Sequence, residues 1–307
     1  MESKKIKALI TGGAGFIGSH LVDFLLEKNW DVTIVDNLSS GNLENVNKKA
    51  KFHKMCLIDT DYNSLLSVFK NIDYVFHMAA SASIPESIED PLKYNKLNVD
   101  STIRCLNLAK DANIKKLIFS ASSSVYGDAK ELPTTELCPV DPLSPYALQK
   151  LIGEQYCKLF SKIYGLNTVS LRYFNVYGER MSLKGAYKLV IPIWEDQFKN
   201  NHPLTVVNDG TQRRDFVYVK DVAYANYCAA ISKKNNGEVY NVGTGNNISI
   251  NEMIEVFDCK SIHIGKRIEP QVMLCNPSLA NKELNWYHKT EFKLWLKEFV
   301  KKMKLIA

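Results

Sequence analysis

The sequence has no closely spaced cysteine pair, and the apolar run after its polar start is much too short to cross a membrane. Its seven cysteines include no C-x-x-C pair, so they indicate neither a disulfide framework nor a zinc site. The first residues, Met1–Lys7, carry no signal-peptide pattern. We therefore expect a soluble, cytoplasmic protein with reduced thiols, no metal and no membrane partner.

The chain also lacks a run of one charge, an internal repeat and a low-complexity tract. Its net charge of +6 is spread along the sequence, which does not favour nucleic-acid binding but leaves cations for a polyanionic small molecule. A chain of 307 residues is longer than those that usually fold around a single hydrophobic core. We expect one large domain with a smaller one attached.

Short apolar runs alternate with amphipathic stretches through the first half of the chain. This alternation predicts right-handed βαβ units and a doubly wound α/β fold, with a parallel sheet covered on both faces. The expected strands are Lys7–Ile10, Asp31–Val35, Tyr74–His77, Lys116–Ser120 and Thr168–Arg172, and the expected helices are Gly18–Lys28, Ser64–Lys70, Asn98–Asn113 and Tyr146–Tyr164.

The rhythm breaks from Asn175 onward, where proline and glycine separate shorter elements. We expect a smaller α/β lobe there, formed by residues 175–214 and 244–307. The large domain would comprise residues 1–174 and segments returning from about 215–243. Phe216–Val222 and Glu238–Val242 are the segments predicted to rejoin the main sheet.

A glycine-rich turn, Thr11–Gly18, lies directly between the first strand and the first helix. Glycines there let the backbone approach a pyrophosphate, and the free N–H groups of the helix attract its charge. Asp36 follows at the end of the second strand, at the distance expected for an acid that binds the adenosine ribose and repels a 2′-phosphate. No arginine follows it nearby. The combination predicts NAD rather than NADP as the cofactor.

A tyrosine and a lysine, Tyr146 and Lys150, share one face of the long predicted helix, because residues four apart are neighbours on a helix. A tyrosine hydroxyl titrates near ~10, and lowering its pKa by ~3 units requires roughly 4 kcal/mol, which a close ammonium and a positive nicotinamide ring would supply. Upstream, Ser122, Ser123 and Ser124 follow a strand at the sheet edge where ligands bind.

Together these motifs resemble the extended short-chain dehydrogenase/reductase family. The resemblance rests on the glycine turn, Asp36, His77–Ala80, the serine cluster, the Tyr146/Lys150 pair and Arg172–Asn175, and it covers nearly the whole chain. Within the family the chain is most similar to UDP-galactose and UDP-N-acetylglucosamine 4-epimerases. The stretches Pro142–Tyr146 and Gly185–Pro192 are most similar to the bacterial group that acts on N-acetylated UDP-sugars.

The resemblance implies an NAD-dependent isomerase that inverts C4 of a UDP-hexose through a transient 4-keto sugar. Tyr146 would be the base, Lys150 its activator, and Ser122 and Ser124 would bind the sugar hydroxyl. The implied cofactor-binding residues are Gly12, Gly15, Phe16, Ile17, Gly18, Asp36, Asn37, Leu57, Ala79, Ala80, Tyr146, Lys150 and Tyr173. The implied substrate-binding residues are Ser83, Ser122, Ser124, Tyr146, Asn175, Val190, Arg214, Arg267 and Met273.

The chain departs from the family pattern at two places. Cys56 stands where the family usually has an aspartate that contacts adenine, although the Leu57 backbone can still bind there. The sugar pocket would be lined by Ala82, Met181, Leu189 and Met273, which makes it more apolar than in the N-acetylhexosamine group. An N-acetylated or dual substrate is favoured only slightly over UDP-glucose and UDP-galactose.

Two other functions stay open. One is a nucleotide-sugar 4,6-dehydratase, a decarboxylase or an epimerase of another NDP-sugar, although the first two need a carboxyl group where this chain has serines. The other is a non-catalytic NAD-binding sensor, which could lose the Tyr146/Lys150 pair freely. Similar epimerases form homodimers through the two helices that correspond to 98–113 and 146–164, so a homodimer is expected.

Overall fold

A seven-stranded parallel sheet forms the centre of the protein. The computed structural model describes residues 5–181, 190–265 and 269–306. The strand order is β10-β6-β5-β4-β1-β2-β3. The bounds are β1 Lys7–Thr11, β2 Asp31–Asp36, β3 Lys51–Lys54, β4 Tyr74–His77, β5 Lys116–Ser122, β6 Thr168–Tyr173 and β10 Asn236–Val242.

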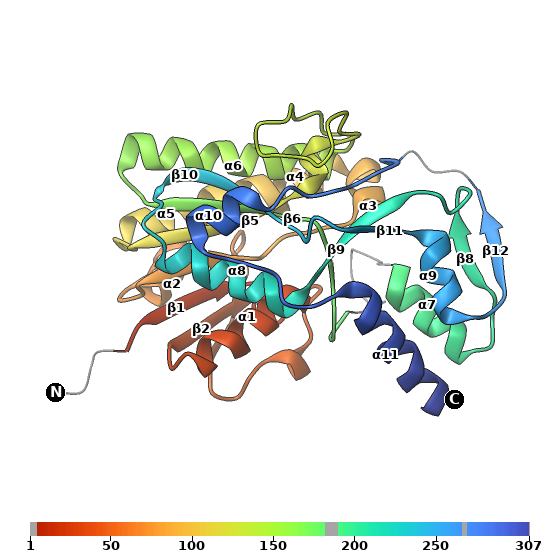
Figure 1. Cartoon of the computed structure of the whole chain (residues 1–307). Helices are drawn as coiled ribbons and strands as arrows, with labels where there is room; N and C mark the ends of the chain where they lie inside the picture. Colours follow the sequence, from red (N-terminus) through yellow and green to blue (C-terminus); the bar gives the residue numbers. More distant parts are fainter. Residues whose placement is uncertain (1–4, 182–189, 266–268, 307) are drawn as a thin grey trace.

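Helices cover both faces of this sheet (Figure 1). One face carries α1 (Phe16–Glu27), α8 (Val219–Ile231) and α10 (Ser278–Leu284), which bury one core cluster with the sheet. The other face carries α2 (Tyr62–Phe69), α5 (Ser101–Asp111) and α6 (Pro145–Tyr164), which bury a second cluster. The predicted Rossmann architecture is therefore confirmed.

The predicted elements of the first half lie close to the observed ones, but β3 and the short helices α3 (Ile84–Glu89) and α4 (Pro91–Asn95) were not predicted. Strand β3 was missed because its sequence Lys-Phe-His-Lys has a single apolar side chain and lies at the sheet edge. The predicted helix over 98–113 also begins earlier, as the π-helical turn η2 (Lys96–Asp100) that continues α4. The other short elements are η1 (Leu43–Asn45) and η3 (Ser123–Tyr126).

The C-terminal part of the chain forms two small sheets with their own core, on the right in Figure 1. One sheet has the order β11-β9-β7, and the other pairs β12 with β8. The bounds are β7 Asn175–Tyr177, α7 Val190–Lys199, β8 Leu204–Val207, β9 Arg213–Tyr218, β11 Asn247–Ser249, α9 Ile250–Phe257, β12 Ser261–Ile264 and α11 Phe292–Ile306. We propose that these elements form the substrate lobe, with α8 and β10 assigned to the large domain.

The prediction that Phe216–Val222 rejoins the main sheet is wrong. Phe216–Tyr218 belongs to β9, which pairs with β7 and β11 in the small sheet, and α8 begins at Val219. Val219, Val222 and Ala223 are buried and recur at helical spacing, so the apolar run bridges a strand and a helix. The second predicted segment, Glu238–Val242, does lie in the main sheet, within β10.

No helix among the described residues is both long and apolar enough to span a lipid bilayer.

Candidate active site

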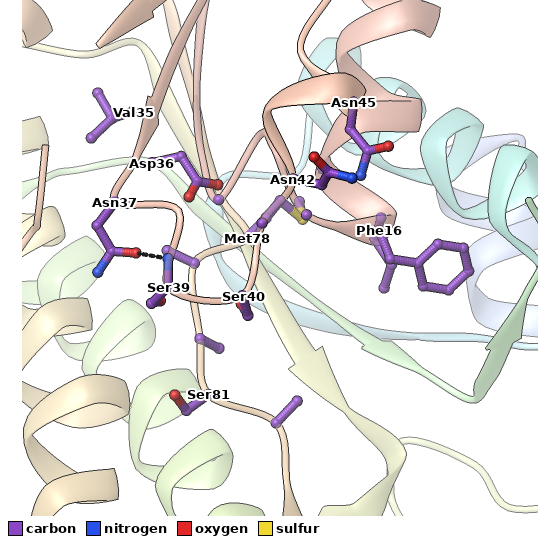
Figure 2. Close-up of a pocket in the computed structure, with 18 of the residues that line it drawn as sticks. Phe16, Val35, Asp36, Asn37, Ser39, Ser40, Asn42, Asn45, Met78 and Ser81 are labelled. Atoms are coloured by element: carbon purple, nitrogen blue, oxygen red, sulfur yellow. Dashed lines mark hydrogen bonds between the residues drawn. The ribbon is translucent and has the colours of Figure 1, made fainter. Parts of the chain in front are cut away.

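A cavity of about 830 Å³ lies along the carboxyl ends of β1, β2 and β4 (Figure 2). Three predicted cofactor residues, Tyr146, Lys150 and Tyr173, are not part of its wall. The ten others line it, and they are Gly12, Gly15, Phe16, Ile17, Gly18, Asp36, Asn37, Leu57, Ala79 and Ala80.

The glycine turn leaves space that no other residue would leave. Gly12 has φ +71°, and a Cβ there would approach the backbone nitrogen of Ala79 to 2.7 Å. A Cβ at Gly18 would collide with the carbonyl oxygen of Gly12. The turn therefore packs tightly on β4 while α1 presents its amino end to the cavity, which suits a pyrophosphate.

Asp36 holds a fixed carboxylate at the end of β2, on the cavity wall. Its two oxygens accept backbone hydrogen bonds from Ala14 (3.0 Å) and Leu38 (2.7 Å). The side chain is buried, so its orientation is set by these bonds. The remaining lone pairs suit two ribose hydroxyls, whereas a 2′-phosphate would meet a negative charge. These residues fit NAD.

A second part of the cavity wall was not predicted from the sequence. The loop after β2 contributes Ser39, Ser40, Asn42 and Asn45, as Figure 2 shows. Polar residues after a strand are ordinary loop composition, so only the fold reveals that this loop lines the cavity.

Arg180, from the loop after β7, also lines the cavity and was not predicted. Its guanidinium donates to the Asp23 carboxylate of α1 at 2.7 Å, and Asp23 accepts a second hydrogen bond from Asn47 at 2.7 Å. Arg180 therefore links the loop after β7 to the middle of α1 and to the segment after β2, while part of its side chain lines the cavity.

Helix α6 brings Tyr146 and Lys150 together. Ser144 caps the helix by accepting from the Ala147 backbone N–H, and Pro145 occupies the first turn, so the helix starts just before Tyr146. The Lys150 Nζ lies 6.0 Å from the centre of the Tyr146 ring. It donates to the Ser120 carbonyl at 2.8 Å, and Ser120 lines the cavity. This hydrogen bond joins α6 to β5 at the cavity wall.

Lys150 is buried, and burial lowers its pKa to about 8, while the nearby Glu154 and Cys157 act in the opposite direction. Burial also raises the pKa of Glu154, against the effect of the Arg172 guanidinium. Arg172 makes two hydrogen bonds to this carboxylate, at 2.9 and 2.7 Å. The Arg172–Glu154 pair therefore joins α6 to β6 directly behind the lysine.

The serine cluster lies at the end of β5. The Ser122 hydroxyl accepts from the Ser124 hydroxyl at 2.8 Å and from the Ser124 backbone N–H at 3.2 Å. Ser123 is buried, so it serves the fold. Ser122 and Ser124 thus form a hydroxyl pair, two and four residues beyond Ser120, whose carbonyl accepts the hydrogen bond from Lys150.

Asn98 is a further residue that sequence reasoning missed. Its side-chain amide binds both the backbone N–H (2.8 Å) and the carbonyl (3.0 Å) of Ser81, and donates to Gln149 of α6 at 2.8 Å. Ser81 lines the cavity, so Asn98 fixes the cavity wall to the helix that carries Tyr146 and Lys150. Asn98 lies in the π-helical turn η2, an irregularity that often marks functional sites.

His77, part of the family motif, lies beneath the cavity as a structural link. Its two ring nitrogens share hydrogen bonds with the hydroxyls of Thr11 (2.8 Å) and Thr102 (3.0 Å). Burial, assisted by the Lys150 charge, lowers the pKa of His77 to about 3. The ring is therefore neutral at neutral pH and joins β1, β4 and α5.

The predicted substrate residues come partly together in the small lobe. The Asn175 amide donates to the Asp215 carbonyl at 2.9 Å and lies 3.9 Å from the Met273 sulfur. Arg214 forms an ion pair with Glu269 at 2.7 Å. Val190 begins α7. Arg267 and Leu189 lie outside the described residues.

Three other predicted or noted residues have local partners. Ser83 caps α3 by accepting from the Glu86 backbone N–H at 3.3 Å. Tyr173 is buried, and its hydroxyl donates to Asn226 of α8 at 2.9 Å and lies 3.7 Å from the sulfur of Met78, which lines the cavity. Cys56 lines the cavity beside Leu57, and its thiol donates to Asp59 at 3.3 Å.

Comparison with known proteins agrees with this geometry. Residues 8–243 match the model of the NAD dependent epimerase/dehydratase family. A Methanocaldococcus jannaschii protein that is provisionally named UDP-glucose 4-epimerase is 44% identical over 81% of this chain and 80% of its own length.

Two solved structures are similar over almost the whole chain. The UDP-N-acetylglucosamine 4-epimerase of Methanobrevibacter ruminantium, in complex with UDP-N-acetylmuramic acid, is 38% identical with a TM-score of 0.91, covering 99% of this chain and 100% of that one. The UDP-glucose 4-epimerase of Thermotoga maritima with UDP-glucose is 34% identical with a TM-score of 0.91, covering 98% and 99%.

The predicted family and the predicted cofactor, NAD, are confirmed by these matches. The glycine turn, Asp36 and Lys150 belong to the motifs on which the predicted family membership rests. The chain belongs to the NAD-dependent epimerase/dehydratase family, among relatives that are UDP-sugar 4-epimerases.

Proposed function

We propose that this protein inverts C4 of a UDP-hexose through a transient 4-keto sugar. The observation that carries the proposal is the docking of Lys150 on the Ser120 carbonyl. The ammonium lies beside the Tyr146 ring, and its acceptor Ser120 lines the cofactor cavity and precedes Ser122 by two residues on β5.

Each residue has a distinct role in the proposed reaction. NAD, when bound, supplies a hydride acceptor that becomes the donor for the opposite face of the sugar. Tyr146 takes the proton of the 4-hydroxyl and returns it, and Lys150 stabilises the phenolate by its charge. Ser122 and Ser124 orient the oxygen at C4. Asn175 and Arg214 hold the UDP group, so that the sugar can turn while the diphosphate stays fixed.

The test is turnover of UDP-N-acetylglucosamine and of UDP-glucose separately, without added NAD, with the C4 epimers resolved by NMR. Tyr146→Phe should lower kcat by at least about 100-fold, the usual contribution of a positioned acid–base group, with the fold and NAD content unchanged. Wild-type protein that binds NAD but converts neither sugar would contradict the proposal.

For the sugar, we propose N-acetylated or dual specificity, with a slight preference over UDP-glucose and UDP-galactose alone. The relatives support both choices, since one similar structure is a UDP-N-acetylglucosamine 4-epimerase and another a UDP-glucose 4-epimerase. Met273 lies beside Asn175, and a methionine side chain can adapt to a bulky acetyl group. Conversion of UDP-glucose alone would show that the pocket is closed to that group.

The alternatives predict different products. A dehydratase needs a carboxyl group where this chain has Ser122, Ser123 and Ser124, and the similar dehydratase of Streptomyces venezuelae, 23% identical, shares the fold alone. If this protein were a dehydratase, it would release water and leave a 4-keto-6-deoxy sugar, which NMR distinguishes from the C4 epimer. A non-catalytic sensor would bind NAD without turnover.

We also propose a homodimer formed through α5 and α6. Leu148, Leu159 and Ile163 recur along one face of α6 and are exposed, although large apolar side chains favour burial. Light scattering after size-exclusion chromatography should give twice the chain mass, and Ile163→Lys should reduce it to one. A monomeric wild-type protein would contradict this proposal.

We also propose that the protein is located in the cytoplasm. All seven cysteines are free thiols, which is typical of proteins kept in a reducing compartment. Fractionation of cells that produce the protein would test it, and recovery outside the cytosol would contradict it.

A further inference from the structure

A second cavity, of about 660 Å³, lies at the amino ends of β1, β2 and β3, the edge of the sheet opposite the cofactor cavity. Its walls carry five lysines, against one aspartate, Asp31. We call it the lysine crevice. Its basic residues are Lys5, Lys7, Lys49, Lys51, Lys70 and His53.

The positive charge of the lysine crevice is largely uncompensated. Among the described residues, Lys7, Lys49, Lys51 and Lys70 form no ion pair, and only Lys5 approaches Asp31, at 3.9 Å. The nearby Asp73 accepts from the Lys7 backbone N–H at 2.8 Å and pairs with the Lys115 ammonium at 2.8 Å. Clustered cations without acidic partners repel one another, so an anion that entered the crevice would relieve this repulsion.

The sheet positions two of these cations. Lys51 is the register partner of Thr33, and Lys7 is the partner of Asp31, so these side chains share the face of the sheet on which α2 packs. Lys5, Lys49 and Lys70 lie in the segments that flank β1, β3 and α2. The polar groups of Asn29, Thr33, Ser67 and Asn71 complete the lining.

The lining selects the kind of anion. Trp30 is buried and its ring stacks on Tyr74 at 5.2 Å, so it does not offer a free aromatic face to a nucleotide base. Ammonium groups distributed around a concave surface, with hydroxyl and amide donors between them, match a ligand with several adjacent phosphates. A single carboxylate or phosphate would leave most of the cations unpaired.

We propose that the lysine crevice binds an oligophosphate chain, at a site separate from the NAD and substrate sites. The ligand could be a free inorganic oligophosphate or the triphosphate of a nucleotide, since both offer the same anionic chain. The inference is independent of the proposed epimerase activity, because it concerns binding at the opposite edge of the sheet.

Calorimetric titration of the NAD-bound protein with inorganic tripolyphosphate in 0.15 M KCl tests the proposal. Lys51→Gln and Lys7→Gln should each weaken binding by roughly five- to tenfold, as the loss of one charge-assisted contact does, and Lys51→Arg should retain it. The control is Lys297→Gln on α11, which makes the same charge change at an exposed position far along the chain and should leave the Kd unchanged. Thermal unfolding of every variant checks the fold.

Two results would overturn the proposal. One is the absence of binding at this salt concentration, and the other is binding that Lys51→Gln and Lys297→Gln weaken equally, since that would reflect net charge alone. Both titrations use saturating UDP, which fills the proposed substrate site, and a parallel titration with UTP then separates the two sources. Tighter binding of UTP with the same dependence on Lys51 indicates a nucleotide, and weaker binding of UTP indicates free oligophosphate.

Discussion

Replacing Lys150 with methionine should stabilise the fold at neutral pH while it removes activity. Burial lowers the pKa of Lys150 from 10.5 to about 8, so the folded protein below pH 8 holds a charged amine in a buried site. At roughly 1.4 kcal/mol per pKa unit, this lowering of the pKa means that keeping Lys150 charged costs the folded state about 3 kcal/mol. Methionine has a similar volume but loses the hydrogen bond to Ser120, worth about 1 kcal/mol. The net gain expected at pH 6.5 is about 2 kcal/mol.

The sign of the pH dependence follows from proton binding. Between pH 8 and 10.5 the unfolded chain keeps a proton on Lys150 that the folded protein has lost, so the stability contributed by this group rises with pH. The advantage of Lys150→Met should therefore shrink by about 2 kcal/mol between pH 6.5 and 9.5.

Urea unfolding of both proteins, freed of NAD, at pH 6.5, 8 and 9.5 measures this difference. Turnover of the variant should fall by at least about 100-fold, because the phenolate of Tyr146 loses its cation. A variant that is less stable than wild type at pH 6.5, or a difference that does not change with pH, would refute the reasoning about burial.

Three further predictions concern the NAD cavity and the proposed sugar pocket. Gly18→Ala forces a Cβ against the Gly12 carbonyl, so the protein should lose at least about tenfold in NAD affinity by calorimetry; unchanged affinity would contradict the proposed cradle. Arg180→Met should weaken NAD binding by about tenfold while loss of the Asp23 ion pair lowers the free energy of unfolding of the NAD-free protein by no more than about 1 kcal/mol, and a larger loss of stability with unchanged NAD affinity would point to a structural role alone. Met273→Tyr should lower kcat/KM for UDP-N-acetylglucosamine by at least about tenfold while UDP-glucose turnover persists, and parallel loss of both would remove Met273 from the acetyl pocket.

The sequence predicted most strands and helices of the main sheet well because these elements have clear periodicity and clear ends. The glycine turn separates β1 from α1, and Ser144-Pro145 marks the start of α6. Prediction was wrong where one apolar run serves two elements, as at Phe216–Val222, where the end of β9 continues directly into α8. It also missed β3, whose single apolar residue leaves almost no pattern.

The chemistry of the candidate site was partly readable in the same way. Asp36, Tyr146 and Lys150 lie in motifs whose spacing alone indicates their neighbours. Arg180 and Asn98 have no such motif, because their partners Asp23 and Gln149 are distant in sequence.

The sequence by itself therefore determined the fold class and the cofactor, and it predicted that Tyr146 and Lys150 share one helix face, since each inference depends on local spacing along one strand or helix. Only the tertiary structure decided what surrounds them. Burial of Lys150, the Arg172–Glu154 pair behind it and the convergence of cations in the lysine crevice all depend on which segments the sheet brings together. Burial and charge density are properties of packed neighbours, and a linear sequence does not specify those neighbours until the chain is folded.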